Sequence, residues 1–123
     1  MLNCDVLVVG AGPAGSSAAR EAAKAGCRVL MVERKPKVGM PVQCAEYIPR
    51  MLMAESRMSG DSIVQGSDSM VTHLPDGGTV VTRSPGYTID RAVFDGELAD
   101  MAREAGAEIL VNTSCLSRSD AGV

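Results

Sequence analysis

Apolar and polar positions divide the first part of the chain into a strand, a helix and a second strand. Residues 4–9 are a short apolar run that ends at Gly10, which favours a fully buried parallel strand. Residues 13–25 are mostly Ala and Ser with charged side chains on one side, and Gly26 follows, which predicts a helix that begins with Pro and ends before Gly. Residues 28–33 predict a second buried strand, so the three segments together predict a right-handed βαβ unit.

The middle of the chain shows a different pattern. Residues 34–43 carry Pro and Gly among basic residues, which predicts an irregular loop, and residues 48–56 predict a short helix without a clean period. Residues 63–89 are β-prone on both sides of Asp76-Gly77-Gly78, which predicts a β-hairpin. We expect this hairpin to be an insertion into the α/β pattern, and we expect its His73 to be structural rather than catalytic.

The last third returns to a helix followed by a strand. Asp90 is expected to cap a helix that ends at Gly106. The apolar face of this helix is formed by Phe94, Leu98, Met101, Ala102 and Ala105. Residues 108–112 predict another parallel strand, and residues 114–123 are expected to begin a further one. The predicted fold class is therefore α/β, with a Rossmann-type parallel sheet and an inserted β-hairpin.

Composition is that of one ordinary globular domain. Apolar residues make up 46% and charged residues 22% of the 123 residues, which argues against disorder and against a coiled coil. The net charge of −3 comes with no basic stripe and with 2% aromatic residues, so nucleic acid is not an expected partner. The start of the chain has no cationic region before its apolar run, and we therefore expect a cytoplasmic protein. The four Cys residues form no Cys-x-x-Cys pair, so no metal site is predicted.

The pattern Gly10-x-Gly12-x-x-Gly15 lies directly between a predicted strand and a predicted helix, as a dinucleotide-binding turn requires. Gly10 would permit the tight turn, Gly12 the close approach of a pyrophosphate, and Gly15 the packing of helix against strand. Glu33 follows Gly15 by 18 residues at the end of the second strand, where its carboxylate can accept both ribose hydroxyls and would repel a 2′-phosphate. The glycine pattern by itself fits either FAD or NAD, and Pro13-Ala14 favours FAD.

Two further sets of residues resemble known flavoproteins. Gly10-Ala11-Gly12-Pro13-Ala14-Gly15 followed by Val32-Glu33-Arg34 resembles the FAD site of the class that includes aromatic hydroxylases. Pro41-Val-Gln-Cys-Ala-Glu46, together with Ile89-Asp-Arg-Ala-Val-Phe-Asp95 and Ala105-Gly-Ala-Glu108, resembles the geranylgeranyl reductase family, whose archaeal members reduce isoprenoid double bonds in membrane ether lipids. The likeness spans nearly the whole chain, but only the N-terminal portion of such enzymes. It implies that residues 1–123 are an FAD-binding domain fragment, with 63–89 in an antiparallel sheet on the substrate side.

The resemblance implies FAD as the cofactor. It assigns the cofactor site to Gly10, Gly12, Pro13, Ala14, Gly15, Glu33, Arg34, Cys44, Ala45, Tyr47, Arg91 and Cys115. In this assignment Ala14 contacts the phosphates and Glu33 the ribose. Arg91 neutralises pyrophosphate charge, and Cys115, on the strand after the second long helix, meets the adenine through its backbone.

Cys44, Ala45 and Tyr47 would line the flavin side in the same assignment. The family pattern has Gly where Tyr47 stands, so a side chain is added where the family brings its backbone close to the cofactor. As catalytic residues the resemblance indicates Cys44 or Glu46, either of which could supply or relay the proton that accompanies hydride transfer.

The implied function is an FAD-dependent reductase of lipid biosynthesis, in which reduced flavin delivers hydride to a polyprenyl double bond. The alternatives are a flavin monooxygenase or other dehydrogenase of the same superfamily, and an FAD-binding fragment without turnover. The electron donor, NAD(P)H or ferredoxin, is left open. A lipid substrate would imply peripheral contact with the membrane, although the sequence shows no amphipathic basic helix for it.

Overall fold

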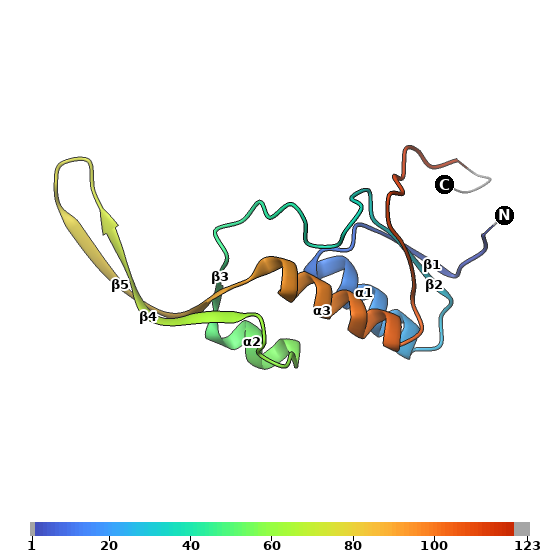
Figure 1. Cartoon of the computed structure of the whole chain (residues 1–123), viewed down its shortest axis with the longest axis horizontal. Coiled ribbons are helices and arrows are strands. Elements are labelled where there is room, and N and C mark those ends of the chain that lie inside the picture. Colours follow the sequence, from blue (N-terminus) through green and yellow to red (C-terminus); the bar gives the residue numbers. More distant parts are fainter. Residues whose placement is uncertain (1, 120–123) are drawn as a thin grey trace. The chain divides into compact units, whose positions relative to one another are not determined.

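The computed structural model describes residues 2–119 of the chain. These residues form two compact units: a parallel-sheet unit made of residues 2–42 and 92–119, and a hairpin unit made of Gln43–Arg91. Figure 1 shows the elements of both, and each unit is described by itself.

The parallel-sheet unit is built on three strands, β1 (Val6–Val9), β2 (Val29–Val32) and β6 (Glu108–Leu110). Their order in the sheet is β1-β2-β6, and both pairs of neighbours are parallel. The parallel Rossmann-type sheet predicted from the apolar runs is therefore confirmed. The short runs of β-branched residues form strands because the helices that connect them cover their side chains.

The two main strands differ in burial. All four residues of β2 are buried, as predicted, and Met31 has no exposed surface. The prediction of a fully buried first strand is wrong, because β1 is half-buried and Val9 is 60% exposed. The reason is the strand order: within residues 2–119, β1 has a neighbouring strand on one side only, whereas β2 lies between β1 and β6.

Helices α1 (Pro13–Lys24) and α3 (Arg91–Glu104) supply the rest of the core of this unit. The buried cluster joins small residues of both helices to the centre of the sheet, and consists of Ala11, Ala19, Val29, Met31, Ala99, Ala102 and Ala107. Alanine side chains allow a helix backbone to lie close to a strand, which is how an aromatic-poor chain fills its core. Both helices end as predicted before a glycine with positive φ, Gly26 at +89° and Gly106 at +108°.

The apolar face predicted for α3 is only partly correct. Phe94, Leu98 and Ala102 are buried, whereas Met101 and Ala105 are half-buried. Asp95 and Ala99 are buried in their place. The buried stripe is therefore turned around the helix axis from the apolar face, because the small Ala99 faces the core rather than the larger Met101.

The segment after β6 does not continue as a strand. Residues 113–118 have no regular structure, and residues 120–123 of the predicted strand lie outside the described residues. Leu116 is 92% exposed and its neighbours are polar, so this segment has no apolar face to bury against the sheet. Instead the chain follows the end of β2, where the Asn112 N–H donates to the Lys35 carbonyl at 3.1 Å.

The hairpin unit contains an antiparallel sheet of order β3-β5-β4, with strands β3 (Tyr47–Pro49), β4 (Ile63–His73) and β5 (Thr79–Ile89). The predicted hairpin is confirmed, and Figure 1 shows β4 and β5 as a long curved ribbon. Its turn is closed by the Leu74 N–H, which donates to the Gly78 carbonyl at 2.8 Å.

The short helix predicted over residues 48–56 begins later than expected. Helix α2 covers Arg50–Ser56, while Tyr47–Pro49 form strand β3. Residues 47–49 are extended because they pair with β5, in a register that places Tyr47 opposite Thr88 and Pro49 opposite Gly86. Pairing with a strand almost forty residues away is a tertiary interaction that a local pattern does not contain.

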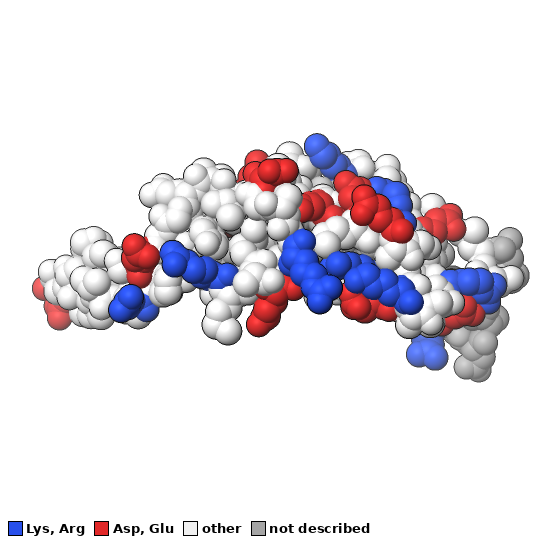
Figure 2. Space-filling view, turned by 90° about the horizontal axis from the view of Figure 1, so that it is seen from below, with Lys and Arg blue, Asp and Glu red and all other residues white. Residues whose placement is uncertain are grey.

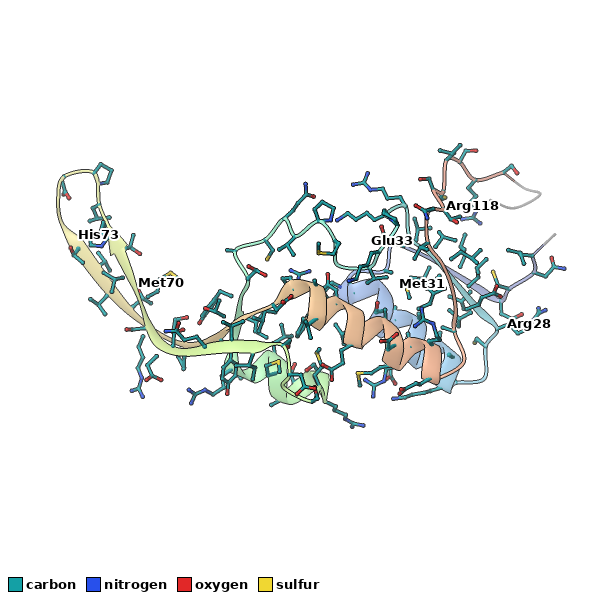
Figure 3. The ribbon with its side chains drawn as sticks, in the orientation of Figure 1. Arg28, Met31, Glu33, Met70, His73 and Arg118 are labelled. Atoms are coloured by element: carbon teal, nitrogen blue, oxygen red, sulfur yellow. The ribbon has the colours of Figure 1, made fainter. Side chains whose placement is uncertain are left out.

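Strands β4 and β5 and the turn between them carry exposed apolar side chains. They are Val64, near the start of β4, and Met70, Val71, Leu74, Val80 and Val81, nearer the turn. Figure 3 shows Met70 and His73 on this hairpin, with His73 near its loop, and both are exposed.

The surface carries charges of both signs. On the face drawn in Figure 2, Lys and Arg side chains lie among Asp and Glu side chains. Within residues 2–119 no helix is long and apolar enough to cross a membrane.

Candidate functional site

The glycine turn joins the end of β1 to the start of α1, and its three glycines meet three different requirements. Gly10 has a φ of +98°, which side chains rarely adopt, and its N–H donates to the Val32 carbonyl at 2.8 Å. A Cβ on Gly15 would lie 1.9 Å from the Gly10 carbonyl oxygen, so helix and strand meet in a space that only glycine fits. A Cβ on Gly12 would meet no atom of the described chain within 4 Å. The turn therefore leaves open space next to Gly12.

Helix α1 begins at this turn with its N–H groups available to a ligand. Gly12 is the N-cap residue and makes no side-chain cap, and Pro13 occupies the first helical position. The first hydrogen bond of the helix runs from the Ser16 N–H to the Gly12 carbonyl at 2.9 Å, so the N–H groups of Ala14 and Gly15 precede the helical ladder. The first turn contains no acidic residue. This helix start can therefore bind an anion such as a phosphate.

Glu33, just after β2, is hydrogen-bonded to the glycine turn. Its Oε2 accepts the Ala11 N–H at 2.9 Å, and its Oε1 accepts the Lys35 N–H at 2.9 Å. Figure 3 labels this half-buried side chain at the end of the strand. Each carboxylate oxygen has a second lone pair that can accept a hydroxyl group. Sequence reasoning predicted the hydroxyl-binding role but missed the bond to Ala11, for which the adjacency of the first two strands was the available signal.

The surroundings of Glu33 favour its ionised form. Burial is the largest single influence and would raise the pKa of Glu33, but the N–H groups of Lys35 and Ala11 and the positive charges of Lys35 and Arg34 together outweigh it. The pKa of Glu33 therefore lies below its ordinary value. A carboxylate held in this way can accept hydrogen bonds from hydroxyl groups and would repel a phosphate.

The segment after β6 runs along the same end of β2. The Glu33 N–H donates to the Leu110 carbonyl at 2.8 Å, and the Thr113 N–H donates to the Glu33 carbonyl at 2.9 Å. The expectation that Cys115 lies on this strand is wrong, because the strand ends at Leu110 and Cys115 is exposed in the irregular segment beyond it. Thr113 is thus hydrogen-bonded directly to Glu33, whereas Cys115 lies two residues farther along the chain.

Three predicted site residues come together in the hairpin unit: Cys44, Glu46 and Arg91. The Glu46 N–H donates to the Cys44 sulfur at 3.5 Å. The Glu46 carbonyl accepts the Ile89 N–H at 2.7 Å, and its Oε1 accepts the Arg91 N–H at 3.1 Å. Glu46 has a φ of +57°, a strained conformation for a residue with a side chain.

The exposed thiol of Cys44 is surrounded by hydrogen-bond donors. The Glu46 N–H is the largest influence and lowers the pKa of Cys44, the slight loss of hydration opposes it, and the hydrogen bond and charge of the Arg91 guanidinium and the Ala45 N–H lower it further. The pKa of Cys44 consequently lies below its ordinary value. Thiols with a lowered pKa have a larger thiolate fraction near neutral pH.

Tyr47 directs its side chain across β5. Its hydroxyl donates to the Ser84 carbonyl at 2.9 Å and lies 2.8 Å from the Ser84 hydroxyl. A Cβ on Gly86 would lie 2.4 Å from the Tyr47 hydroxyl oxygen and 2.5 Å from the Ile48 carbonyl oxygen. The tyrosine that departs from the glycine of the family pattern is therefore bound to the hairpin sheet, and Gly86 provides the space for its ring.

The predicted cofactor residues are divided between the two units. The glycine turn, Glu33, Arg34 and Cys115 belong to the parallel-sheet unit, and residues 44–47 with Arg91 belong to the hairpin unit. Arg34 and Ala45 are exposed. Within residues 2–119 no three His, Cys, Asp or Glu side chains gather in a way that could hold a metal ion.

Comparison with known proteins gives the chain its family. The model of the FAD dependent oxidoreductase family matches residues 5–122. Digeranylgeranylglycerophospholipid reductase 1 of Methanopyrus kandleri is 46% identical over 107 residues, which cover 85% of this chain and 28% of that protein. The digeranylgeranylglycerophospholipid reductase of Methanosphaerula palustris is 38% identical over 120 residues, which cover 92% of this chain and 30% of that protein.

Solved structures agree with this comparison. A geranylgeranyl bacteriochlorophyll reductase-like protein of Thermoplasma acidophilum superposes with a TM-score of 0.83 and 34% identity, over 92% of this chain and 31% of that one. Aklavinone-11 hydroxylase, solved as a ternary complex with FAD and aklavinone, superposes with a TM-score of 0.63 and 26% identity, over 98% of this chain and 28% of that one.

The chain thus spans between 28% and 31% of the length of these relatives. The family model nevertheless matches nearly all residues of this chain. The predicted likeness to geranylgeranyl reductases is confirmed by sequence and by structure. With the strand, glycine turn, helix and acidic residue in the arrangement described above, the chain belongs to the family of FAD-dependent oxidoreductases, whose cofactor is FAD.

Proposed function

We propose that this chain forms the nucleotide-binding end of the FAD site in a reductase of isoprenoid double bonds. The observation that carries the cofactor part is the Glu33 carboxylate, which is hydrogen-bonded to the glycine turn beside the open space at Gly12. The reductase part rests on the 46% identity to a digeranylgeranylglycerophospholipid reductase.

The residues of the parallel-sheet unit fit an FAD molecule. The pyrophosphate would lie at Gly12, where no side chain intervenes, and would accept the N–H groups of Ala14 and Gly15. Glu33 would accept the ribose hydroxyls through lone pairs that the Ala11 and Lys35 N–H groups leave available. Pro13 suits this first helical position, because an N–H there would have no partner within the helix.

The resemblance assigns further residues to contacts with FAD. Arg34 would lie beside the ribose, Cys115 beside the adenine, and Arg91 beside the pyrophosphate. The flavin side would be lined by Cys44, Ala45 and Tyr47, as in the family that the loop resembles. When bound and reduced, FAD supplies the hydride chemistry of such enzymes.

The chain itself would contribute a proton donor and an apolar surface for the substrate. Reduction of a carbon–carbon double bond adds a hydride to one carbon and a proton to the other. We assign this proton to the Cys44 sulfur, whose lowered pKa suits transfer near neutral pH, with the Glu46 carboxyl as the second candidate. We propose that residues 63–89 lie on the substrate side, where exposed apolar residues of the hairpin such as Val64 and Met70 would face a polyprenyl substrate.

The proposed lipid substrate also suggests where in the cell the protein works. The names of the relatives specify a glycerophospholipid that carries geranylgeranyl chains. We therefore propose a role in lipid biosynthesis, in the cytoplasm and in peripheral contact with the membrane. The electron donor would be NAD(P)H or ferredoxin.

Two measurements test the proposal. Titration with FAD, followed by flavin fluorescence, tests the nucleotide-binding end. Anaerobic incubation of the reduced holoprotein with digeranylgeranylglycerophospholipid vesicles, followed by mass spectrometry of the lipid, tests the reaction, and saturation of the chains is the expected result. If the protein binds FAD but the mass of the lipid does not change, the protein is a cofactor-binding module and the reductase assignment is refuted.

A flavin monooxygenase is the second candidate, because aklavinone-11 hydroxylase is 26% identical to the chain. It predicts oxygen-dependent oxidation of NAD(P)H that an aromatic substrate accelerates. Measuring oxygen consumption with and without such a substrate separates the two enzymes, since a reductase of isolated double bonds works without oxygen.

A further inference from the structure

Glu46 holds the junction between β5 and α3 from two sides. Its backbone carbonyl accepts the Ile89 N–H at 2.7 Å, and its carboxylate Oε1 accepts the Arg91 N–H at 3.1 Å. The residue between them, Asp90, donates its N–H to the Ser62 carbonyl at 2.8 Å. The Glu46 side chain thus accepts the backbone N–H of Arg91, while backbone bonds hold the two residues before it.

Arg91 in turn reaches the thiol that the loop presents. Its guanidinium lowers the pKa of Cys44 through hydrogen bonding and its positive charge, and the sulfur also receives the Glu46 N–H at 3.5 Å. The sulfur therefore has two donors that the loop backbone sets, the Glu46 and Ala45 N–H groups, and one donor, the Arg91 guanidinium, that depends on where α3 begins. We attribute only the position of the guanidinium to the Glu46 carboxylate.

We infer that Glu46 is a positioning residue, whose carboxylate holds Arg91 in place so that the guanidinium stays against the Cys44 sulfur. A side-chain oxygen that accepts the first N–H of a helix acts as a cap, a role that glutamine can also fill and alanine cannot. The inference does not depend on the proposed reaction, because the state of the thiol can be measured in the chain without cofactor.

Positioning and direct charge predict opposite effects on the thiol. If the Glu46 carboxylate acted on Cys44 through its negative charge, removing that charge would lower the pKa of Cys44. If it acts by holding Arg91, removing the acceptor withdraws a cation from the sulfur and raises that pKa. The direction of the change therefore distinguishes the two.

The experiment measures the pH midpoint of Cys44 alkylation by iodoacetamide in the purified chain, with each cysteine quantified by peptide mass spectrometry. Glu46→Ala should raise the midpoint by about 0.3 to 0.7 pH unit, the equivalent of a two- to fivefold change and typical of an exposed charge contact. Arg91→Ala should raise it at least as much. Glu46→Gln, which keeps an acceptor at the same place without the charge, should not raise it. Cys115, exposed in the other unit, is the internal control and should keep its midpoint in every variant.

A double variant completes the test. Once Arg91 is alanine, adding Glu46→Ala should cause no further rise, since the residue through which Glu46 acts is gone. A Glu46→Ala midpoint equal to or below that of the unchanged chain would overturn the inference. An upward shift that persists in the Arg91→Ala background would overturn it as well, because Glu46 would then act on the thiol by another route. If Glu46→Ala unfolds the chain, the comparison of Glu46→Gln with Arg91→Ala still decides, because a rise in Glu46→Gln would contradict the acceptor role.

Discussion

Replacement of Gly12 by valine separates cofactor binding from folding. Gly12 has a φ of −77° and a ψ of −178°, an extended conformation that any residue adopts, and a Cβ there would meet no atom of the described chain within 4 Å. The fold can therefore accept valine at this position, and we expect a loss of stability of no more than about 1 kcal/mol, from a poorer N-cap. The new methyl groups would occupy the space that the pyrophosphate needs.

The expected loss of FAD affinity follows from the contacts at stake. Displacing the pyrophosphate removes its hydrogen bonds to the Ala14 and Gly15 N–H groups, and hydrogen bonds to a charged group contribute about 1.5–3 kcal/mol each. Loss of both corresponds to about 3–6 kcal/mol, or a roughly hundredfold or greater rise in Kd. FAD titration by flavin fluorescence gives the affinity, and urea unfolding gives the stability.

Gly15→Val is the matched control. Its Cβ would lie 1.9 Å from the Gly10 carbonyl oxygen and 3.2 Å from Val8 Cγ1, so α1 would have to move away from β1. This variant should lose stability, by about 1–3 kcal/mol or more, together with FAD binding. A Gly12→Val chain that binds FAD as tightly as the unchanged chain would refute the site. If the Gly12→Val chain unfolds as readily as the Gly15→Val chain, the conclusion that the space next to Gly12 is open would be refuted.

Four further variants test other parts of the structure. Glu33→Ala should weaken FAD binding by about 1–3 kcal/mol, measured by titration calorimetry, because the hydroxyl acceptors are lost; an unchanged affinity would mean that Glu33 does not contact the ribose. The depressed pKa of Glu33 adds stability that is present above its ordinary value of 4.5 and is lost as pH falls through the lower folded value. Urea unfolding should therefore show a larger loss of stability on acidification below that pH for the unchanged chain than for Glu33→Gln, and parallel curves would contradict this. Tyr47→Phe should lower the free energy of unfolding by about 0.5–1.5 kcal/mol in urea unfolding, because the bond to the Ser84 carbonyl is lost, and an unchanged stability would contradict this. Gly86→Ala, whose Cβ would lie 2.5 Å from the Ile48 carbonyl oxygen, should destabilise the chain by about 1–3 kcal/mol in thermal unfolding, and a stable variant would show that β3 and β5 are less close than described.

Much of the nucleotide-binding end could be predicted because its signals are local. Gly10 and Gly15 lie within one turn of chain, and the requirement for glycine at each arises from backbone atoms a few residues away. The position of Glu33 follows from the lengths of one helix and one strand. Even there, the hydrogen bond from the Ala11 N–H to Glu33 depends on β1 and β2 being neighbours, which the turn residues alone do not specify.

The flavin-side residues show where sequence reasoning stops. Resemblance to a family grouped Cys44, Glu46 and Arg91, but the bonds among them depend on β3 pairing with β5 and on α3 starting directly after it. The same pairing turns Tyr47–Pro49 into a strand and carries the Tyr47 side chain to Ser84.

The sequence by itself determined the glycine turn, the parallel strands and helices around it, the acidic residue after β2 and the hairpin turn. Each of these depends on a steric or hydrophobic preference that acts within a few residues. Only the tertiary structure decided that β1 is half-buried, that Cys115 lies beyond its strand, and that Glu46 holds Arg91 beside Cys44. Burial and hydrogen-bond partners depend on which distant segments become neighbours, and that choice is made by the packing of the whole chain rather than by any one stretch of it.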